Sequence, residues 1–377
     1  MNILYLTNHL NIGGITSYVF TLAKGMKRRG HNVYIASSAG RLLPGFIAQG
    51  IVYIPIPIKT KSEISYKLLI SKFKLLKYIK ERNIEIIHAN TRVTQVLSFL
   101  IQRTCGKPYI STCHGFFKKR FFRKIFPCWG NKVIAISESV KEHLLRDFKV
   151  KEEDIRVIHN GIDVDKFRAQ SSESRVDLKK KLGLGEGPVI GIIARLSEEK
   201  GHTYLIKAMP EVITRIPQAQ LLIVGEGRMR EELVSLTQEM SLEKSVLFLP
   251  SVMDTQEVLS SMDLFVLPSL KEGLGLALME AMACGLAVVG SDVGGIKSLI
   301  QDRYNGLLVR HSDSRELSYA ILELLQNSDQ AKSLGSNARI FINQNFSAGK
   351  MVLETEEVYL ECLNPALSYS RGLRRIV

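Results

Sequence analysis

The sequence predicts an α/β protein of two domains, each built on a parallel sheet with helices on both faces. Its 377 residues suffice for two separate hydrophobic cores. Short apolar runs alternate with helical segments along the whole chain, which is the pattern of βαβ units. Glycine-containing loops follow several of these runs, where a strand gives way to a helix. The predicted fold class is therefore α/β with two doubly wound domains.

In the first half of the chain, apolar runs predict strands, and amphipathic or basic segments predict helices. We expect strands at 3–7, 33–36, 52–54, 84–88, 108–112, 132–136 and 155–158. We expect helices at 15–29, 62–81, 94–103 and 137–147, with Ser137 as the N-cap of the last one.

The second half continues this alternation after a polar segment rich in Ser and charged residues. We expect strands at 189–194, 221–224, 246–249, 264–267, 287–290 and 306–309, and a helix at 313–326 with Asp313 or Ser312 as its cap. We place the domains at 1–165 and 188–345, with a linker at 166–187, a terminal helix within 346–364 and a basic tail at 365–377.

The composition is typical of a cytoplasmic globular protein. Hydrophobic residues make up 45% and charged residues 23% of the chain. We expect neither a membrane-spanning helix nor a signal peptide, because no apolar run is long enough and a strand-like run opens the sequence. The five Cys residues are scattered without CxxC spacing, which argues against a disulfide framework and a structural zinc site.

The net charge of +14 is unevenly distributed along the chain. Residues 1–160 contain 27 Lys and Arg against 9 Asp and Glu, a balance of +18. Residues 161–377 contain 24 against 28, a balance of −4. The first half is therefore suited to an anionic surface or substrate, and the second half is not.

A strand-loop-helix stretch at 264–285 has the most informative pattern. Glu272 lies in the predicted loop, and Glu280 lies about one turn into the helix, which Gly285 ends. Gly273 and Gly275 allow close backbone approach, and free N–H groups at a helix N-terminus attract an anion. Such a site suits a phosphate held by the backbone and carboxylates that accept hydrogen bonds from sugar hydroxyls. The alternative is an ordinary unit with two surface Glu residues.

Two further loops after strands suit the same chemistry. Arg195 and Lys200 follow the strand at 189–194, and two cations at this spacing can grip a diphosphate. Gly225-Glu226-Gly227 forms a turn after the strand at 221–224, where we expect it near a nucleotide base. Taken singly, each of these residues also suits an ordinary protein surface.

In the first half, two features stand at the carboxyl ends of predicted strands, where open α/β sheets bind ligands. Gly13-Gly14 opens the helix at 15–29 but lacks the GxGxxG pattern, so nicotinamide binding is disfavoured. His114 follows the strand at 108–112, and His9 in the first loop is a minor candidate base. A tight turn and a structural histidine are the alternatives.

The Glu272-x7-Glu280 motif with its two glycines and the Ala-Met-Ala-Cys-Gly helix end resembles the signature of retaining nucleotide-sugar glycosyltransferases of family 4. The resemblance covers nearly the whole chain. It implies the GT-B fold, which has two facing Rossmann-like domains with an interdomain cleft. It also implies that the first Glu contacts the donor sugar and the second contacts the ribose. The family usually has Phe where this chain has Leu274.

The resemblance also assigns roles to the other loops. It implies that His114 contacts the donor sugar and that Arg195 and Lys200 contact the diphosphate, so we expect these three and Glu272 to act in the reaction. The implied donor-binding set is Gly14, Arg195, Lys200, Gly225, Glu226, Gly227, Glu272, Gly273, Leu274, Gly275, Leu276 and Glu280.

A segment that interleaves four aromatic and five basic residues follows His114. It consists of Phe116, Phe117, Lys118, Lys119, Arg120, Phe121, Phe122, Arg123 and Lys124. Such a mixture suits insertion at an anionic membrane surface or contact with an acceptor. A solvated basic helix is one alternative. Nucleic-acid binding is another, but no nucleic-acid fold signature accompanies the segment.

The sequence and its resemblance to this family therefore imply a retaining, metal-independent glycosyltransferase that moves a sugar, with a UDP-sugar favoured as donor, to a hydroxyl of a lipid-carried or envelope glycan acceptor. We expect no cofactor, no nucleic-acid partner, and a peripheral position on the inner face of the cytoplasmic membrane. We reject Asp163-Val164-Asp165 as a metal site because it lies in a predicted interdomain turn. The alternatives are a nucleotide-sugar epimerase of the same fold and a non-catalytic protein that binds anionic surfaces.

Overall fold

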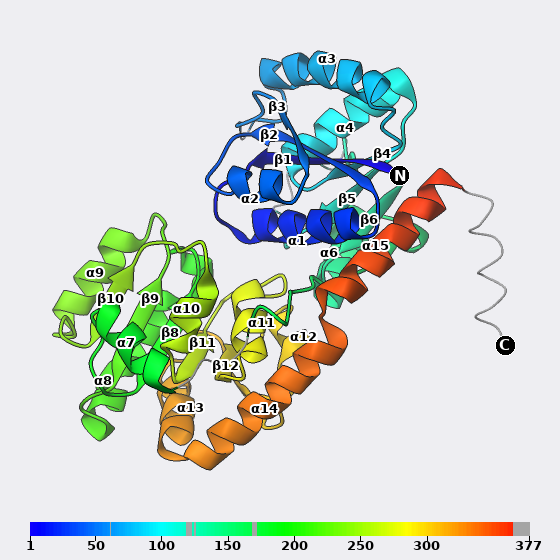
Figure 1. Cartoon of the computed structure of the whole chain (residues 1–377). Coiled ribbons are helices and arrows are strands. Elements are labelled where there is room, and N and C mark those ends of the chain that lie inside the picture. Colours follow the sequence, from blue (N-terminus) through cyan, green and yellow to red (C-terminus); the bar gives the residue numbers. More distant parts are fainter. Residues whose placement is uncertain (61, 118–122, 124–125, 168–171, 365–377) are drawn as a thin grey trace, which may run out of the picture. The chain divides into compact units, whose positions relative to one another are not determined.

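The computed structural model describes residues 1–60, 62–117, 123, 126–167 and 172–364 (Figure 1). It divides into two compact units. Unit 1 comprises Met1–Gly161 and Ala348–Val377, and unit 2 comprises Ile162–Ser347. Each unit is built on one parallel sheet with helices on both faces, which confirms the predicted fold class.

Unit 1 contains a seven-stranded parallel sheet in the order β3-β2-β1-β4-β5-β6-β7. The interior strand β1 pairs with β2 on one side, where Leu4 lies opposite Tyr34, and with β4 on the other, where Leu4 lies opposite Ile87. The strands are β1 Asn2–His9, β2 Asn32–Ser38, β3 Val52–Pro55, β4 Ile86–Ala89, β5 Tyr109–Cys113, β6 Lys132–Ala135 and β7 Ile155–Val157.

The helices of unit 1 begin and end where local sequence signals allow. The Ser65 hydroxyl accepts a hydrogen bond from the Lys67 N–H at the start of α3, Thr91 forms a capping box with Thr94 at the start of α4, and Ser137 caps α6 as predicted. The helices are α1 Gly14–Arg28, α2 Leu43–Ala48, α3 Tyr66–Glu81, α4 Arg92–Cys105, α6 Glu138–Phe148, the short η1 Glu152–Asp154, and α15 Ala348–Leu363.

Two hydrophobic layers cover the faces of this sheet. Because side chains alternate along a strand, Ile3 and Tyr5 of β1 enter one layer and Leu4 and Leu6 enter the other. The first layer contains residues of α1, α2 and α15, and the second contains residues of α3 and α4. The helix α15, far along the chain, therefore helps to form the core of unit 1, and Figure 1 shows it beside α1.

Unit 2 contains a six-stranded parallel sheet in the order β10-β9-β8-β11-β12-β13. Its central strands are continuous apolar runs because both faces of the sheet are covered. The strands are β8 Val189–Ile193, β9 Gln220–Val224, β10 Val246–Leu249, β11 Leu264–Leu267, β12 Ala287–Ser291 and β13 Leu307–Val309.

The helices of unit 2 include one in the segment that we assigned to a linker. This helix, α7 Ser172–Lys181, is tied to the sheet because Arg175 and Lys179 both form ion pairs with Asp263, at 2.6 and 3.2 Å. Asp313 caps α13, one of the two caps that we proposed. The other helices are η2 Glu198–Lys200, α8 His202–Arg215, α9 Arg230–Glu239, α10 Thr255–Ser260, α11 Leu276–Ala283, α12 Ile296–Leu299, α13 Ser314–Gln326 and α14 Ser328–Asn345.

The strand order reverses direction at one point in each sheet. In unit 1 the reversal lies between β1 and β4, and in unit 2 it lies between β8 and β11. The loops that leave the carboxyl ends of these strands border the usual ligand site of such sheets. Among the described residues, no helix is both long and apolar enough to cross a bilayer.

Candidate functional site

The carboxyl edge of the unit 2 sheet brings four loops together. The loop after β8 contacts the loop after β11, because the Leu270 N–H donates to the Glu199 carbonyl at 2.8 Å. The loop after β11 contacts the loop after β12, where the Gly295 N–H donates to the Glu272 carbonyl at 2.9 Å. The loop after β9 joins through a 3.0 Å bond from the Leu196 N–H to the Glu226 carbonyl. All four loops thus border the point where the strand order reverses.

An ion pair between Lys200 and Glu272 lies at the centre of this edge. The Lys200 Nζ lies 2.5 Å from the Glu272 carboxylate, and the two side chains are 21% and 11% exposed. The same carboxylate accepts bonds from the Ser269 hydroxyl at 3.4 Å and the Gly273 N–H at 3.2 Å. Two residues 72 positions apart, each predicted to bind the donor, are therefore in direct contact.

Two glycines permit this close packing. Gly201 adopts φ +70°, and a Cβ there would lie 1.9 Å from the Pro268 carbonyl oxygen. Gly275 adopts φ +100° as the N-cap of α11, which leaves the first N–H groups of that helix without a side-chain cap. Both positions require a residue without a Cβ, in a backbone region that L residues rarely adopt.

Glu280 is the second predicted carboxylate and has a different environment. It lies within α11, and its Oε2 accepts a hydrogen bond from the Thr255 hydroxyl at 2.9 Å. Burial raises the pKa of Glu280 to about 7, although the hydroxyl bond and the nearby Lys166 both act to lower it. The Thr255 contact was not predicted, because nothing in the sequence links α10 to α11.

Arg195 and the Gly225-Glu226-Gly227 turn lie on the outer part of the same edge. The Arg195 side chain is 70% exposed, and its guanidinium is 3.8 Å from the Glu199 carboxylate. Glu226 and Gly227 are exposed as well, whereas Gly225 is buried. Leu274 is buried too, at 1% exposure. Leu276 begins α11 and is half-buried.

In unit 1, His114 lies at the carboxyl end of β5, as expected. Its Nε2 is 3.3 Å from Asn90 Oδ1, and its ring stands edge-on to the Tyr18 ring at 4.7 Å. Burial lowers the pKa of His114 to about 3, so its imidazole is neutral at physiological pH. Gly14 begins α1 and is exposed, and His9 accepts a bond from the Asn11 N–H within the first loop.

Sequence reasoning missed a buried polar chain beneath His114. His88 is fully buried, with Nδ1 2.7 Å from the Tyr359 hydroxyl and Nε2 2.7 Å from the Thr112 hydroxyl. The Tyr359 hydroxyl donates to Tyr5 at 3.0 Å, so it accepts from Nδ1–H, and Nε2 accepts from Thr112. Tyr18 joins at 3.2 Å from Thr112. Burial lowers the pKa of His88 to about 3, which keeps this chain uncharged.

The predicted membrane segment lies largely outside the described residues. Lys118, Lys119, Arg120, Phe121, Phe122 and Lys124 are among those that the structure does not describe.

The three described members of this segment pack inward. Arg123 is only 7% exposed, and its guanidinium lies 4.2 Å from the centre of the Phe117 ring. Phe117 also lies 6.0 Å from Trp129, and Phe116 lies 5.4 Å from His143. Contrary to expectation, Arg123 does not present its charge to a surface.

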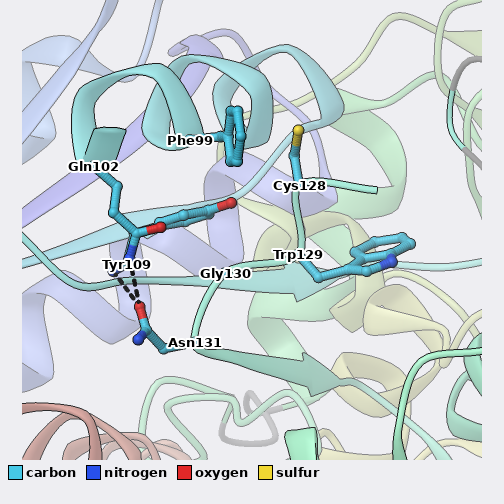
Figure 2. Close-up of a pocket in the computed structure, with 7 residues that line it drawn as sticks. All are labelled: Phe99, Gln102, Tyr109, Cys128, Trp129, Gly130 and Asn131. Carbon is cyan, nitrogen blue, oxygen red and sulfur yellow. Dashed lines mark hydrogen bonds between the residues drawn. The ribbon is translucent and has the colours of Figure 1, made fainter. Parts of the chain in front are cut away.

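A hollow on unit 1 contains none of the predicted donor residues. Figure 2 shows it beside α4 and β5, where Asn131 accepts bonds from the Gln102 side chain at 3.0 Å and the Tyr109 N–H at 3.1 Å. It is lined by Phe99, Gln102, Tyr109, Cys128, Trp129, Gly130 and Asn131. Within the described ranges, no three His, Cys, Asp or Glu side chains gather as a possible metal site, and the Asp163-Val164-Asp165 turn is no exception.

Comparison with family models assigns both halves of the chain. Residues 12–166 match the model described as Glycosyltransferase Family 4, and residues 174–341 match the model described as Glycosyl transferases group 1. The four loops of the unit 2 edge all lie within the second match, and His114 lies within the first.

Individual proteins agree with these matches. The chain is 30% identical over 312 residues to UDP-Gal:alpha-D-GlcNAc-diphosphoundecaprenol alpha-1,3-galactosyltransferase of Escherichia coli, which covers 78% of this chain and 79% of the relative. It is 25% identical over 374 residues to N-acetyl-alpha-D-glucosaminyl L-malate synthase of Bacillus anthracis, at 95% and 96% coverage. The Anabaena protein HepE, solved with UDP and glucose, superposes with a TM-score of 0.85 at 23% identity, over 95% of this chain and 99% of that one.

Proposed function

Because this chain belongs to glycosyltransferase family 4 and is a transferase of the GT-B type, we propose that it moves a sugar from a UDP-sugar to a hydroxyl of a lipid-carried glycan, with retention and without a metal. The observation that carries the proposal is the contact between Lys200 and Glu272 at the reversal of the unit 2 sheet. It joins a cation suited to a diphosphate and a carboxylate suited to sugar hydroxyls in one site.

The donor occupies the four loops of unit 2 in this proposal. Lys200 and Arg195 balance the charge of the diphosphate, and the uncapped N-terminus of α11 adds N–H donors. Glu272 holds sugar hydroxyls, and Glu280 holds the ribose. The HepE complexes with UDP, glucose and UDP-glucose support a UDP-sugar as donor.

In the proposed retaining reaction, the way Glu272 is bound favours a route without a covalent sugar-enzyme intermediate. Its carboxylate already accepts hydrogen bonds from Lys200, Ser269 and Gly273, which stabilise its charge and weaken it as a nucleophile. We therefore propose attack on the same face from which the diphosphate leaves. The bond from the anomeric carbon to the phosphate oxygen breaks, the acceptor oxygen bonds to that carbon, and the hydroxyl proton passes to the leaving diphosphate.

Independence from metal rests on the positive groups of the site. Lys200, Arg195 and the helix N-terminus supply the field that a metal ion would otherwise supply. Activity should survive treatment with EDTA, and Asp163→Asn should change it little. Loss of turnover with EDTA and recovery with Mg²⁺ or Mn²⁺ would contradict this part of the proposal.

The lipid-carried acceptor rests on the charge of unit 1 and on one relative. Residues 1–160 carry a balance of +18, which suits an anionic acceptor or membrane surface. The E. coli relative is named for a diphosphoundecaprenol-linked acceptor. We accordingly propose a peripheral position at the inner face of the cytoplasmic membrane.

The test incubates the purified protein with a panel of UDP-sugars, with and without a diphosphoundecaprenol-linked saccharide. We expect UDP release and a glycosylated lipid by mass spectrometry, and the same anomeric configuration in donor and product by NMR. Interconversion of UDP-sugars without acceptor would indicate an epimerase. Absence of any turnover across the panel, despite UDP binding, would count against the proposal.

A further inference from the structure

The outward face of the helix α3 differs from that of an ordinary surface helix, whereas its inner face is typical. Its inner face buries Leu68, Leu75 and Ile79 in the layer shared with α4. Figure 1 shows α3 on the outer side of α4, so the opposite face of α3 is turned away from the sheet.

That outer face is apolar at its N-terminal end. Ile64, Tyr66, Leu69, Ile70 and Phe73 are 83%, 68%, 53%, 49% and 69% exposed. Among the described residues, these are five of the fifteen large hydrophobic side chains exposed to this degree, and they fall within ten consecutive positions. Single exposed apolar residues are common, but a contiguous group marks an interaction surface.

The rest of the exposed surface of α3 is basic. The helix contains five lysines, Lys67, Lys72, Lys74, Lys77 and Lys80, and a single acidic residue, Glu81. The balance on the helix alone is therefore +4. Glu63 precedes the helix, but its carboxylate is paired with Arg92 at 2.9 Å. A helix with large apolar side chains and lysines around them is the pattern of an element that lies in a membrane interface.

We propose that the outer face of α3, defined by Ile64, Tyr66, Leu69, Ile70 and Phe73 with the surrounding lysines, docks this protein on an anionic lipid bilayer. The apolar side chains enter the boundary between headgroups and acyl chains, and the lysines contact anionic headgroups. The proposal deepens the lipid-carried acceptor proposed above and rests on it for the reason why the enzyme visits a membrane.

Charge argues against two other occupants of this face. A second copy of the chain would set the same +4 helix against itself, because a two-fold interface pairs identical patches. The chain's own segment 365–377 carries three arginines and no acidic residue, so it offers no complementary charge either. An anionic bilayer matches both the apolar and the basic parts of the face.

The position of the face fits the proposed reaction. Helices in βαβ units start at the carboxyl edge of the sheet, so the apolar N-terminal end of α3 lies at the same edge as His114. Two contacts tie the preceding segment to this edge. The Thr60 carbonyl accepts from the Asn8 side chain at 3.0 Å, and Glu63 pairs with Arg92 just after β4. A bilayer against α3 would therefore lie beside the loops of unit 1 that we expect near the acceptor.

The test measures co-sedimentation of the full chain with vesicles. One set is phosphatidylcholine alone, and the other is phosphatidylcholine and phosphatidylglycerol in equal parts. The apolar variant carries Leu69→Asn, Ile70→Asn and Phe73→Asn. Its matched control carries Ile47→Asn, Val52→Asn and Ile340→Asn, three positions that are 56%, 47% and 53% exposed elsewhere.

The basic part of the face has its own pair of variants. One carries Lys74→Ser, Lys77→Ser and Lys80→Ser. The control carries Lys151→Ser, Lys180→Ser and Lys332→Ser, all exposed, and Lys151 matches Lys77 because each Nζ lies 3.8 Å from a Glu carboxylate. Thermal unfolding of every variant checks that the fold is intact.

We expect the parent and both controls to bind the anionic vesicles, and binding to weaken as salt is raised. The apolar and the lysine variants should each bind about tenfold more weakly. Transfer to a soluble, lipid-free acceptor should be unchanged in all of them, which separates failure of docking from failure of the proposed chemistry.

Parent-like binding by both α3 variants would overturn the proposal and return membrane binding to the segment 116–124. Equal binding to both kinds of vesicle would overturn the anionic preference. If ultracentrifugation shows a dimer that only the apolar variant dissociates, the face is an interface between copies of the chain instead.

Discussion

The two sheets share the same kind of strand reversal but carry opposite chemistry at their carboxyl edges. In unit 2 the edge carries a charged pair, Lys200 and Glu272, in loops packed so closely that one added Cβ would collide with a carbonyl. In unit 1 the edge carries a neutral imidazole, His114, above an uncharged chain of buried hydroxyls around His88. The same architecture therefore carries two different sets of side chains at its strand ends, one charged and one neutral.

The largest effect should come from breaking the charged pair of unit 2. We expect Lys200→Ala and Glu272→Ala each to lower kcat/KM for transfer by about a hundredfold to a thousandfold, because each removes a charged contact that strengthens in the transition state. Steady-state assays with saturating acceptor measure this. Lys207→Ala and Glu239→Ala, at exposed helix positions of the same unit, serve as controls. Near-parental rates for either site variant would remove the pair from the reaction.

The next largest effect is a difference between the two units in how much stability they lose at acid pH. Between pH 4.5 and 6.5, His88 and His114 bind protons in the unfolded chain but not in the native one, because their native pKa values are about 3. Each histidine lowers the stability of the fold by about 1.4 kcal/mol for every pH unit as the pH falls. The two together therefore lower the stability of unit 1 by about 3 kcal/mol for every pH unit.

Unit 2 should respond much less in the same window. His202, with a native pKa of about 4, loses stability in the same way. Glu280 opposes it, because its native pKa of about 7 favours the folded state at acid pH, a gain that is lost as pH rises through 7. Fluorescence of the single tryptophan, Trp129, reports on unit 1, and hydrogen exchange in β8 and β11 reports on unit 2. The exposed His311→Gln should change neither profile, and coincident midpoints for the two units would contradict the difference.

Two glycines with nearly the same backbone conformation, one in each unit, allow the packing of the loops in the two units to be compared. Gly201 in unit 2 and Gly106 in unit 1 have φ values of +70° and +71°, but a Cβ at Gly201 meets Pro268, and one at Gly106 meets nothing within 4 Å. Gly106→Ala should cost about 1–2 kcal/mol for its backbone conformation alone. Gly201→Ala should cost more, because the loop must also move, and it should lower transfer. Chemical denaturation measures both, and equal costs would show that the loop yields freely.

The smallest effect concerns Glu280 and UDP. Because protonation removes the negative charge of the carboxylate, UDP affinity should fall a few-fold, about threefold to tenfold, as pH drops from above to below 7. Isothermal calorimetry in the parent and in Glu280→Gln measures this. The variant should bind with a flatter pH profile, and an unchanged profile would assign the dependence to another group.

Local patterns predicted most of the fold. Most strands contain a short apolar run, and Ser137, Asp313 and Gly285 mark helix ends where the structure has them. These local patterns could not predict hydrogen bonds between residues that are far apart in the sequence. His88 and Tyr359 are 271 positions apart, and neither periodicity nor capping relates residues at that separation. The Thr255 bond to Glu280 escaped prediction for the same reason.

The outer face of α3 shows another limit of pattern reading. Apolar residues occur almost all round this helix, with Leu68, Leu69 and Ile70 in succession, so periodicity did not identify which side is buried. Aromatic and basic residues at 116–124 looked more suited to a membrane, but Arg123 and Phe117 pack inward. Only the packing of α3 on α4 shows which of its apolar side chains face outward.

The helix α15 also bears on how the protein is made. Unit 2 is one continuous segment, Ile162–Ser347, whereas unit 1 needs Met351, Val352, Val358 and Tyr359 of α15 for its core. A ribosome works from the N-terminus, so unit 2 has all its residues before unit 1 receives its last helix. Unit 1 must therefore wait, with the α15 side of its core uncovered, while about 190 further residues are synthesised. A chain that ends at Ser347 and has been released from the ribosome should resist protease in unit 2 and be cut in unit 1. Equal resistance of the two units would show that unit 1 folds without its last helix.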